Sequence, residues 1–191
     1  MEMIRREEYG LVLDFLPHGK SGGASSEPTA QVVGETQFTL LEVTLKLGVK
    51  TQEGERLYLG REARDKVDRI VGRISYNDLT NSAHNALVPV VGKIVKSREP
   101  DFVQFLNRAG AINIRCHSLE LLPSVGKKHL QSILDARTKQ PFASFEDIQN
   151  RVPHIRSVEQ IVVDRVLEEL RGDSKYYLFT KPAREEEERR Y

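Results

Sequence analysis

The stretch "LLPSVGKKHLQSILDAR", residues 121–137, decides how the C-terminal half of the chain is expected to fold. Pro123 lacks a backbone N–H and restricts the residue before it, so it ends a short helix. Gly126 permits a close backbone approach, and a new helix is predicted to begin near Lys127. The first N–H groups of a helix have no partner within it, and its positive dipole end attracts anions. Lys127 and Lys128 therefore stand where a phosphate group is expected to bind.

This turn is the predicted binding site of the chain. A phosphate would accept hydrogen bonds from backbone amides near Gly126 to His129, and Lys127 or Lys128 would add positive charge. A purely structural turn between two helices is the alternative. The predicted phosphate-binding residues are Ser124, Val125, Gly126, Lys127, Lys128 and His129.

Leu122 to Gly126, followed by "KKHLQSILDAR", resembles the hairpin of the helix-hairpin-helix motif, whose usual pattern is apolar, Pro, Gly, apolar, Gly. The segment "PFASFEDIQNRVPHIRSVEQIVVDRVLEEL" is similar to the connector and second copy of the tandem form, so the resemblance covers about 118–170. In that family the hairpins grip nucleic-acid phosphates without reading bases, sometimes with a monovalent cation held by hairpin carbonyls. The resemblance implies the same ligand here, and that cation is the one cofactor considered.

The second hairpin, Val152 to Arg156, lacks both glycines of the pattern. It is expected to be mainly a packing repeat that completes a small helical core. The alternative is that Arg156 reaches a phosphate with its side chain.

The N-terminal part shows strand patterns. "YGLVLDFL" is rich in branched and aromatic residues, "FTLLEVTLKL" alternates apolar and polar residues, and 56–60 forms a third strand. A fourth strand arises if 31–47 bends. Residues 17–30 are rich in Gly, Ser and Pro and predict a long loop, in which His18 and Lys20 either contact nucleic acid or do nothing.

From about residue 63 the apolar spacing becomes helical, first at Val67, Ile70, Val71 and Ile74, and then from Leu79 to Val95 with a kink or break at Pro89. Further helices are predicted from Pro100 to Gly110, over 118–122, over 127–137, over 144–151 with Ser144 as its cap, and over 157–170. Residues 111–116 form a short extended linker or strand.

The whole layout, with "RISYNDLT" at 73–80 and "EPDFVQFLNRAG" at 99–110, resembles an archaeal family of uncharacterised proteins described as RNA-binding. That resemblance implies an N-terminal OB-like or S1-like barrel. It also favours RNA over DNA as the ligand. The residues themselves do not distinguish between the two.

The composition bounds the class of protein. The 29 Lys and Arg residues balance 28 Asp and Glu residues, so a nucleic-acid site must be a local patch. No apolar stretch approaches the roughly 20 residues of a membrane span, the N-terminus resembles no signal peptide, and the single cysteine fits a reducing compartment, so a cytoplasmic protein is expected.

No catalytic or metal-binding constellation stands out. Cys116 and His117 point to opposite faces of an extended segment, and the other histidines show no ligand spacing. "HGKSGG" lacks the first glycine of a P-loop. We therefore expect a protein that is not an enzyme and holds no metal.

We expect an α+β chain: an OB-like β unit with packing helices in 1–110, an all-α tandem helix-hairpin-helix domain in 111–171, and a charged tail in 172–191. The expected function is sequence-nonspecific binding of nucleic-acid phosphates. The alternatives are a protein-interaction adaptor with structural hairpins, or an accessory subunit of a nucleic-acid-processing or translation complex. Protein partners are not predicted.

Overall fold

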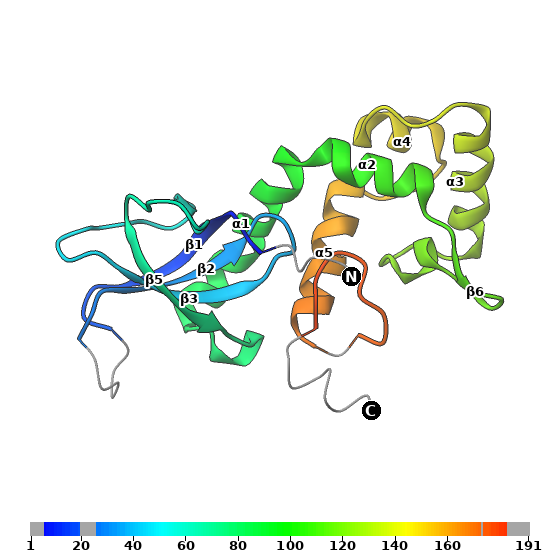
Figure 1. The fold of residues 1–191 in the computed structure, drawn as a ribbon. Helices are drawn as coiled ribbons and strands as arrows, with labels where there is room; N and C mark the ends of the chain where they lie inside the picture. The colour runs from blue at the N-terminus through cyan, green and yellow to red at the C-terminus, as the bar shows by residue number, and fades with distance from the viewer. Residues whose placement is uncertain (1–5, 20–25, 173, 183–191) are drawn as a thin grey trace. The chain divides into compact units, whose positions relative to one another are not determined.

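The computed structural model describes residues 6–19, 26–172 and 174–182 (Figure 1). The chain divides into two compact units. One comprises residues 1–91 together with 169–191, and the other comprises residues 92–168. The division between the units falls within two long helices, α1 (Asn81–Ser97) and α5 (Val158–Leu170).

The first unit contains a curled antiparallel sheet of five strands in the order β4-β1-β2-β3-β5. The strands are β1 (Tyr9–Leu16), β2 (Thr29–Gly34), β3 (Leu40–Leu45), β4 (Arg56–Tyr58) and β5 (Val67–Arg73), followed by the 3-10 turn η1 (Tyr76–Asp78). Their apolar side chains, such as Val12, Val32 and Val43, form a buried core. The fourth strand that a bend within 31–47 would give is present, because β2 and β3 are separate strands that pair with each other.

The small closed barrel expected for the N-terminal strands is not formed among the described residues. The sheet order places β4 and β5 at its two opposite ends, so among the described residues the sheet stays open. The strand β4 has only three residues, and these pair with Tyr9, Gly10 and Leu11 of β1. A strand that short offers little backbone for closing a barrel.

The predicted helix around Val67 to Ile74 is also wrong, because this segment is the strand β5. Its pairing with β3 skips Asp68 and Val71, which are extra residues at two irregularities of the ladder. Such bulges change the side-chain alternation of a strand. They set the two core-facing residues, Val67 and Ile70, three positions apart, which imitates helical spacing.

Hydrogen bonds in the first unit fix the start of helix α1 (Asn81–Ser97). The side chain of Gln31 donates to the carbonyl of Asp78 and accepts from the N–H of Thr80, both at 2.9 Å. Thr80 in turn caps the helix by accepting from the N–H of Ala83. The helix is continuous through Pro89, so of the kink or break expected there, the break is wrong.

Residues 174–182 belong to the first unit. The buried carboxylate of Glu169 accepts hydrogen bonds from the backbone N–H groups of Leu178, Phe179 and Thr180 at 2.7–3.0 Å. The predicted tail therefore starts as an anchored segment, and residues 183–191 lie outside the described residues.

The second unit contains the end of α1, then α2 (Glu99–Arg108), the two-stranded sheet β6 (Ala111–Asn113) and β7 (Cys116–His117), the 3-10 turn η2 (Ser118–Leu121), α3 (Lys127–Lys139), α4 (Phe145–Arg151) and most of α5 (Val158–Leu170). The expected all-α tandem domain is wrong, because strands and helices are interleaved here and the chain after α5 returns to the sheet-containing unit. Ser144 caps α4 as predicted. No helix in the described part of the chain combines the length and the apolar character that crossing a membrane requires.

Candidate nucleic-acid interface

The turn that precedes α3 is closed by its own backbone. The N–H of Val125 donates to the carbonyl of Leu122 at 3.1 Å, and Ser124 has a φ of 65°. Proline in the second position and a positive φ in the third describe a type II turn, which ordinarily prefers glycine there. The side chains of Leu122 and Val125 are buried, so they anchor the turn in the core of its unit. Val125 is therefore an anchor whose N–H is used within the turn.

The first turn of α3 is open to solvent. Its backbone ladder starts with the N–H of Leu130, which donates to the carbonyl of Gly126 at 2.9 Å. The N–H groups of Lys127, Lys128 and His129 precede that ladder, and Gly126 has no side chain to cap them. A Cβ built on Gly126 would meet nothing within 4 Å, and its φ of −89° is open to any residue. The fold itself therefore does not require glycine at this position.

The first turn of α3, like that of α1, carries no acidic residue, but it differs from α1 in beginning with two lysines. Helices prefer acidic residues in the first turn, and α2, α4 and α5 each carry at least one there. In α3 no acidic residue occupies the first turn, which begins instead with the exposed Lys127 and Lys128. Neither lysine forms an ion pair within the described residues. This helix start therefore combines two exposed positive charges with three amides that have no partner in the described part of the chain, an arrangement that an anion would stabilise.

His129 contributes to the turn itself. Its Nδ1 lies 3.0 Å from the carbonyl oxygen of Ser124, and this contact joins the first turn of α3 to the preceding loop. The imidazole therefore positions the turn. The backbone N–H of His129 remains one of the three amides that precede the hydrogen-bond ladder of α3.

The turn before α5 shares one backbone feature with the turn before α3, but its helix end differs. His154 has a φ of 60°, which matches Ser124 in the first turn. Here, however, Ser157 accepts from the N–H of Gln160 at 3.3 Å, and the side chain of Gln149 accepts from the N–H of Val158 at 3.0 Å. Two of the three corresponding amides are thus occupied at α5. Arg156 is exposed beside this capped end.

Of the two loop residues predicted as secondary contacts, only His18 is among the described residues, and it belongs to the other unit. His18 is exposed in the turn after β1. Lys20 lies outside the described residues. Within the described residues, no group of three His, Cys, Asp or Glu side chains could hold a metal ion.

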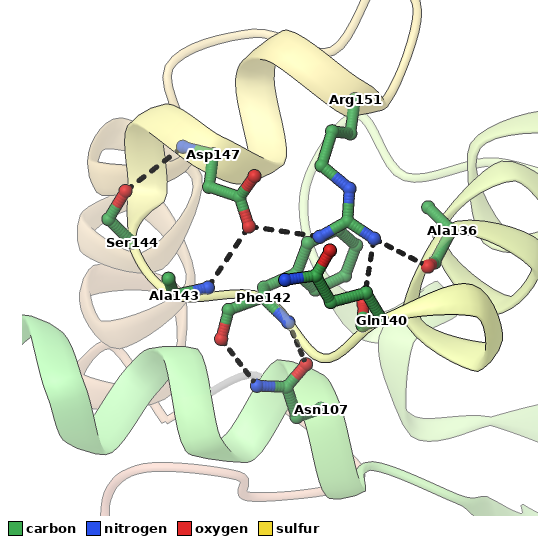
Figure 2. A network of polar contacts seen from close by, with 8 residues as sticks. All are labelled: Asn107, Ala136, Gln140, Phe142, Ala143, Ser144, Asp147 and Arg151. Atoms are coloured by element: carbon green, nitrogen blue, oxygen red, sulfur yellow. Dashed lines mark hydrogen bonds and ion pairs between the residues drawn. The ribbon is translucent and has the colours of Figure 1, made fainter.

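The far end of α3 is fixed by one arginine. Figure 2 shows the guanidinium of Arg151 between the carboxylate of Asp147 and the carbonyls of Ala136 and Gln140, at 2.6–2.9 Å. The N–H of Ala143 lowers the pKa of Asp147, and Arg151 lowers it further. This network keeps the C-terminal end of α3 in place, and with it the direction in which the N-terminal end points.

The turn η2 connects the site to β7 through His117. The N–H of Leu119 donates to Nδ1 of His117 at 3.1 Å, and the carboxylate of Glu120 accepts from the N–H of His117 at 2.9 Å. Burial lowers the pKa of the His117 imidazole, and the charge of Arg137 lowers it further. Sequence reasoning placed His117 in an extended segment and missed this role, which the "HSLE" pattern of a capping box could have indicated.

We expect the free energy of unfolding to fall as the pH drops below about 6.5, the ordinary pKa of histidine. The unfolded chain binds a proton at His117 that the folded chain resists, so stability is full above that pH and is lost between the unfolded and the lowered folded pKa. Chemical denaturation between pH 5 and 8 measures the effect. The variant His117→Asn keeps an acceptor but does not titrate, and it should show a shallower pH dependence. Equal slopes for the two proteins would contradict this role.

The chain has relatives among known proteins. The family model described as "Protein of unknown function (DUF655)" matches residues 6–181. The chain belongs to this family. The DUF655 chain is 40% identical over 177 residues to "Uncharacterized protein MJ0038" of Methanocaldococcus jannaschii, and the match covers 92% of this chain and 80% of that protein.

A solved structure shows the same fold. The crystal structure of Af1531 from Archaeoglobus fulgidus, of the DUF655 family, has a TM-score of 0.85 and 43% sequence identity. The match covers 92% of this chain and 100% of that one. The expected relation to an archaeal uncharacterised family is thus confirmed at that level.

Proposed function

We propose that this DUF655 protein binds the phosphate backbone of nucleic acid at the N-terminus of α3. One observation carries the proposal: two exposed lysines begin a helix that has no acidic residue in its first turn and no side-chain cap. The positive end of the helix dipole repels the charge of each lysine, which costs about 0.3–1 kcal/mol of stability per lysine at low ionic strength. The negative charge of a bound phosphate offsets that repulsion, and its oxygens accept hydrogen bonds from the backbone amides at the helix start.

The ligand follows from the chemistry of the site. Backbone amides and lysine side chains contact phosphate oxygens and carry no sequence information, so binding should depend on salt far more than on sequence. RNA is the first ligand to test, because the resemblance described above favours it, and duplex DNA is the second. The capped start of α5 supports a structural role for the second turn. No catalytic role and no cofactor is part of the proposal.

Gly126 offers a test that separates binding from folding. Because a Cβ there meets open space, Gly126→Asp should fold normally and cap α3, with a free energy of unfolding equal to or a few tenths of a kcal/mol above that of the unchanged protein. Its carboxylate would occupy the phosphate position, so binding of RNA should weaken by about tenfold or more at low salt. Fluorescence titration and chemical denaturation measure the two effects.

The matched control is Gly126→Asn, which has the same shape and capping ability but no charge. It should weaken binding less than Gly126→Asp, and the gap between the two variants should shrink as salt rises. If both variants bind RNA as tightly as the unchanged protein, the phosphate does not lie at α3.

A further inference from the structure

The hairpin of β6 and β7 exposes apolar side chains at its tip. Ile114 and Arg115 form the two-residue turn between Asn113 and Cys116, and the side chain of Ile114 is fully exposed. Ile112, on the adjoining strand, is also exposed. Neither turn residue has a positive φ, so the backbone tolerates isoleucine here, but core packing does not account for a fully exposed one.

The hairpin is held firmly. The side chain of Asn113 accepts from the N–H of Arg115 at 2.8 Å, which fixes the turn. At its base, the N–H and the hydroxyl of Ser118 both donate to the carbonyl of Gly110, at 3.0 and 2.7 Å. A projecting side chain on such a support loses little conformational freedom when it contacts a partner.

The charge around the hairpin fits a polyanion. From the start of β6 to the end of α3, residues 111–139 contain five basic and two acidic residues, a net charge of +3 within a chain whose net charge is +1. Glu120 is engaged with the backbone of His117. Arg115, next to Ile114, is exposed and forms no ion pair within the described residues.

The hairpin is also continuous with the phosphate site. The turn η2 packs against both β7 and α3, and only residues 115–126 separate Ile114 from the first exposed amide of α3, with Leu122 and Val125 anchoring the chain between them. Figure 1 shows the hairpin that carries the β6 label extending beyond α3 at the lower right. Both features lie in the same unit.

We infer that Ile114 is an apolar wedge, which contacts an unstacked base of the nucleic acid whose phosphate binds at α3, with Arg115 on a neighbouring phosphate. This inference rests on the proposed function and deepens it. Isoleucine and similar side chains serve as wedges against base steps in other nucleic-acid-binding proteins, where a larger bound surface offsets the cost of unstacking. The protein should therefore prefer nucleic acid that carries a bulged or unpaired base over a perfect duplex.

The test uses two RNA duplexes of the same sequence, one fully paired and one with a single bulged 2-aminopurine. The unchanged protein should bind the bulged RNA about tenfold more tightly, since a bulge removes part of the unstacking cost. Ile114→Ser should bring the two affinities within about twofold and abolish the change in 2-aminopurine fluorescence on binding. Its thermal midpoint should not move, because the side chain is fully exposed.

The matched control is Leu47→Ser, which removes another exposed apolar side chain. It should keep the preference of the unchanged protein for the bulged RNA. If Ile114→Ser keeps that preference too, as it would if Ile114 served a protein partner, the wedge is refuted.

The outcomes also separate the wedge from the proposed function. Reversing the charges of Lys127 and Lys128 should weaken binding of both RNAs. If that variant loses both RNAs while Ile114→Ser changes nothing, the phosphate site stands and only the wedge fails. If neither RNA binds the unchanged protein, both proposals fall.

Discussion

The double variant Lys127→Glu with Lys128→Glu should bind nucleic acid roughly a hundredfold more weakly than the unchanged protein at low salt, as expected when two phosphate contacts become repulsive. Its folding should not suffer. Glutamates in the first turn of a helix are favourable, so the free energy of unfolding should stay the same or rise by about 1 kcal/mol. Titration of RNA at several salt concentrations, with denaturation in parallel, measures both quantities.

The salt dependence adds a second readout. The slope of log affinity against log salt should become shallower by about 1.8, the value for two lost phosphate contacts on a duplex. The matched control reverses Lys93 and Lys96, which are exposed on α1 in the same unit. That control should lose far less affinity.

Arg156 tests the second turn. Because α5 is capped by Ser157, Arg156→Ala should change affinity less than about threefold, the effect of one exposed charge. A loss as large as that of the lysine pair would show that the second turn binds phosphate as well. A double lysine variant that binds like the unchanged protein would remove the basis of the proposed function.

The variant Arg151→Met should destabilise the unit of residues 92–168 by about 3 kcal/mol, in the range for breaking a partly buried network of charged hydrogen bonds. Methionine keeps most of the apolar stem but leaves the carbonyls of Ala136 and Gln140 without their donor (Figure 2). It also removes the contact of the guanidinium with the Phe142 ring, 4.7 Å from its centroid. Chemical denaturation measures the loss.

Arg156→Met is the matched control, since it makes the same change at an exposed arginine. Its free energy of unfolding should stay within about 0.5 kcal/mol of the unchanged protein. If the two variants are equally stable, the network of Figure 2 does not hold the end of α3 in solution.

The helical elements could be predicted because their local signals agree with the fold. Pro100 near the start of α2, Ser144 before α4 and Pro123 ahead of α3 act within a few residues of where they stand. The strand β5 could not be predicted in this way. Its apolar spacing is produced by bulges against β3, and those depend on a partner more than 20 residues away.

The site was predictable in part for the same reason. The position of Lys127 and Lys128 at a helix start follows from Pro123 and Gly126 nearby. The difference between the two turns is also local, because Ser157 is visible in the sequence as a cap, although the prediction rested on the missing glycines. The hydrogen bond of Gln149 with the N–H of Val158 could not be predicted from the sequence, because it depends on how α4 packs beside the start of α5.

The most direct test of the central claim is to follow the backbone amides of the ¹⁵N-labelled protein by NMR while a short single-stranded RNA is added. We predict that the amide signals of Gly126, Lys127, Lys128 and His129 shift most among the helix starts, and that the shifts diminish at high salt. The amides of Val158 and Gln160, which are already capped, should move little. If saturable shifts appear elsewhere and the signals of residues 126–129 do not move, phosphate binding at the start of α3 is contradicted.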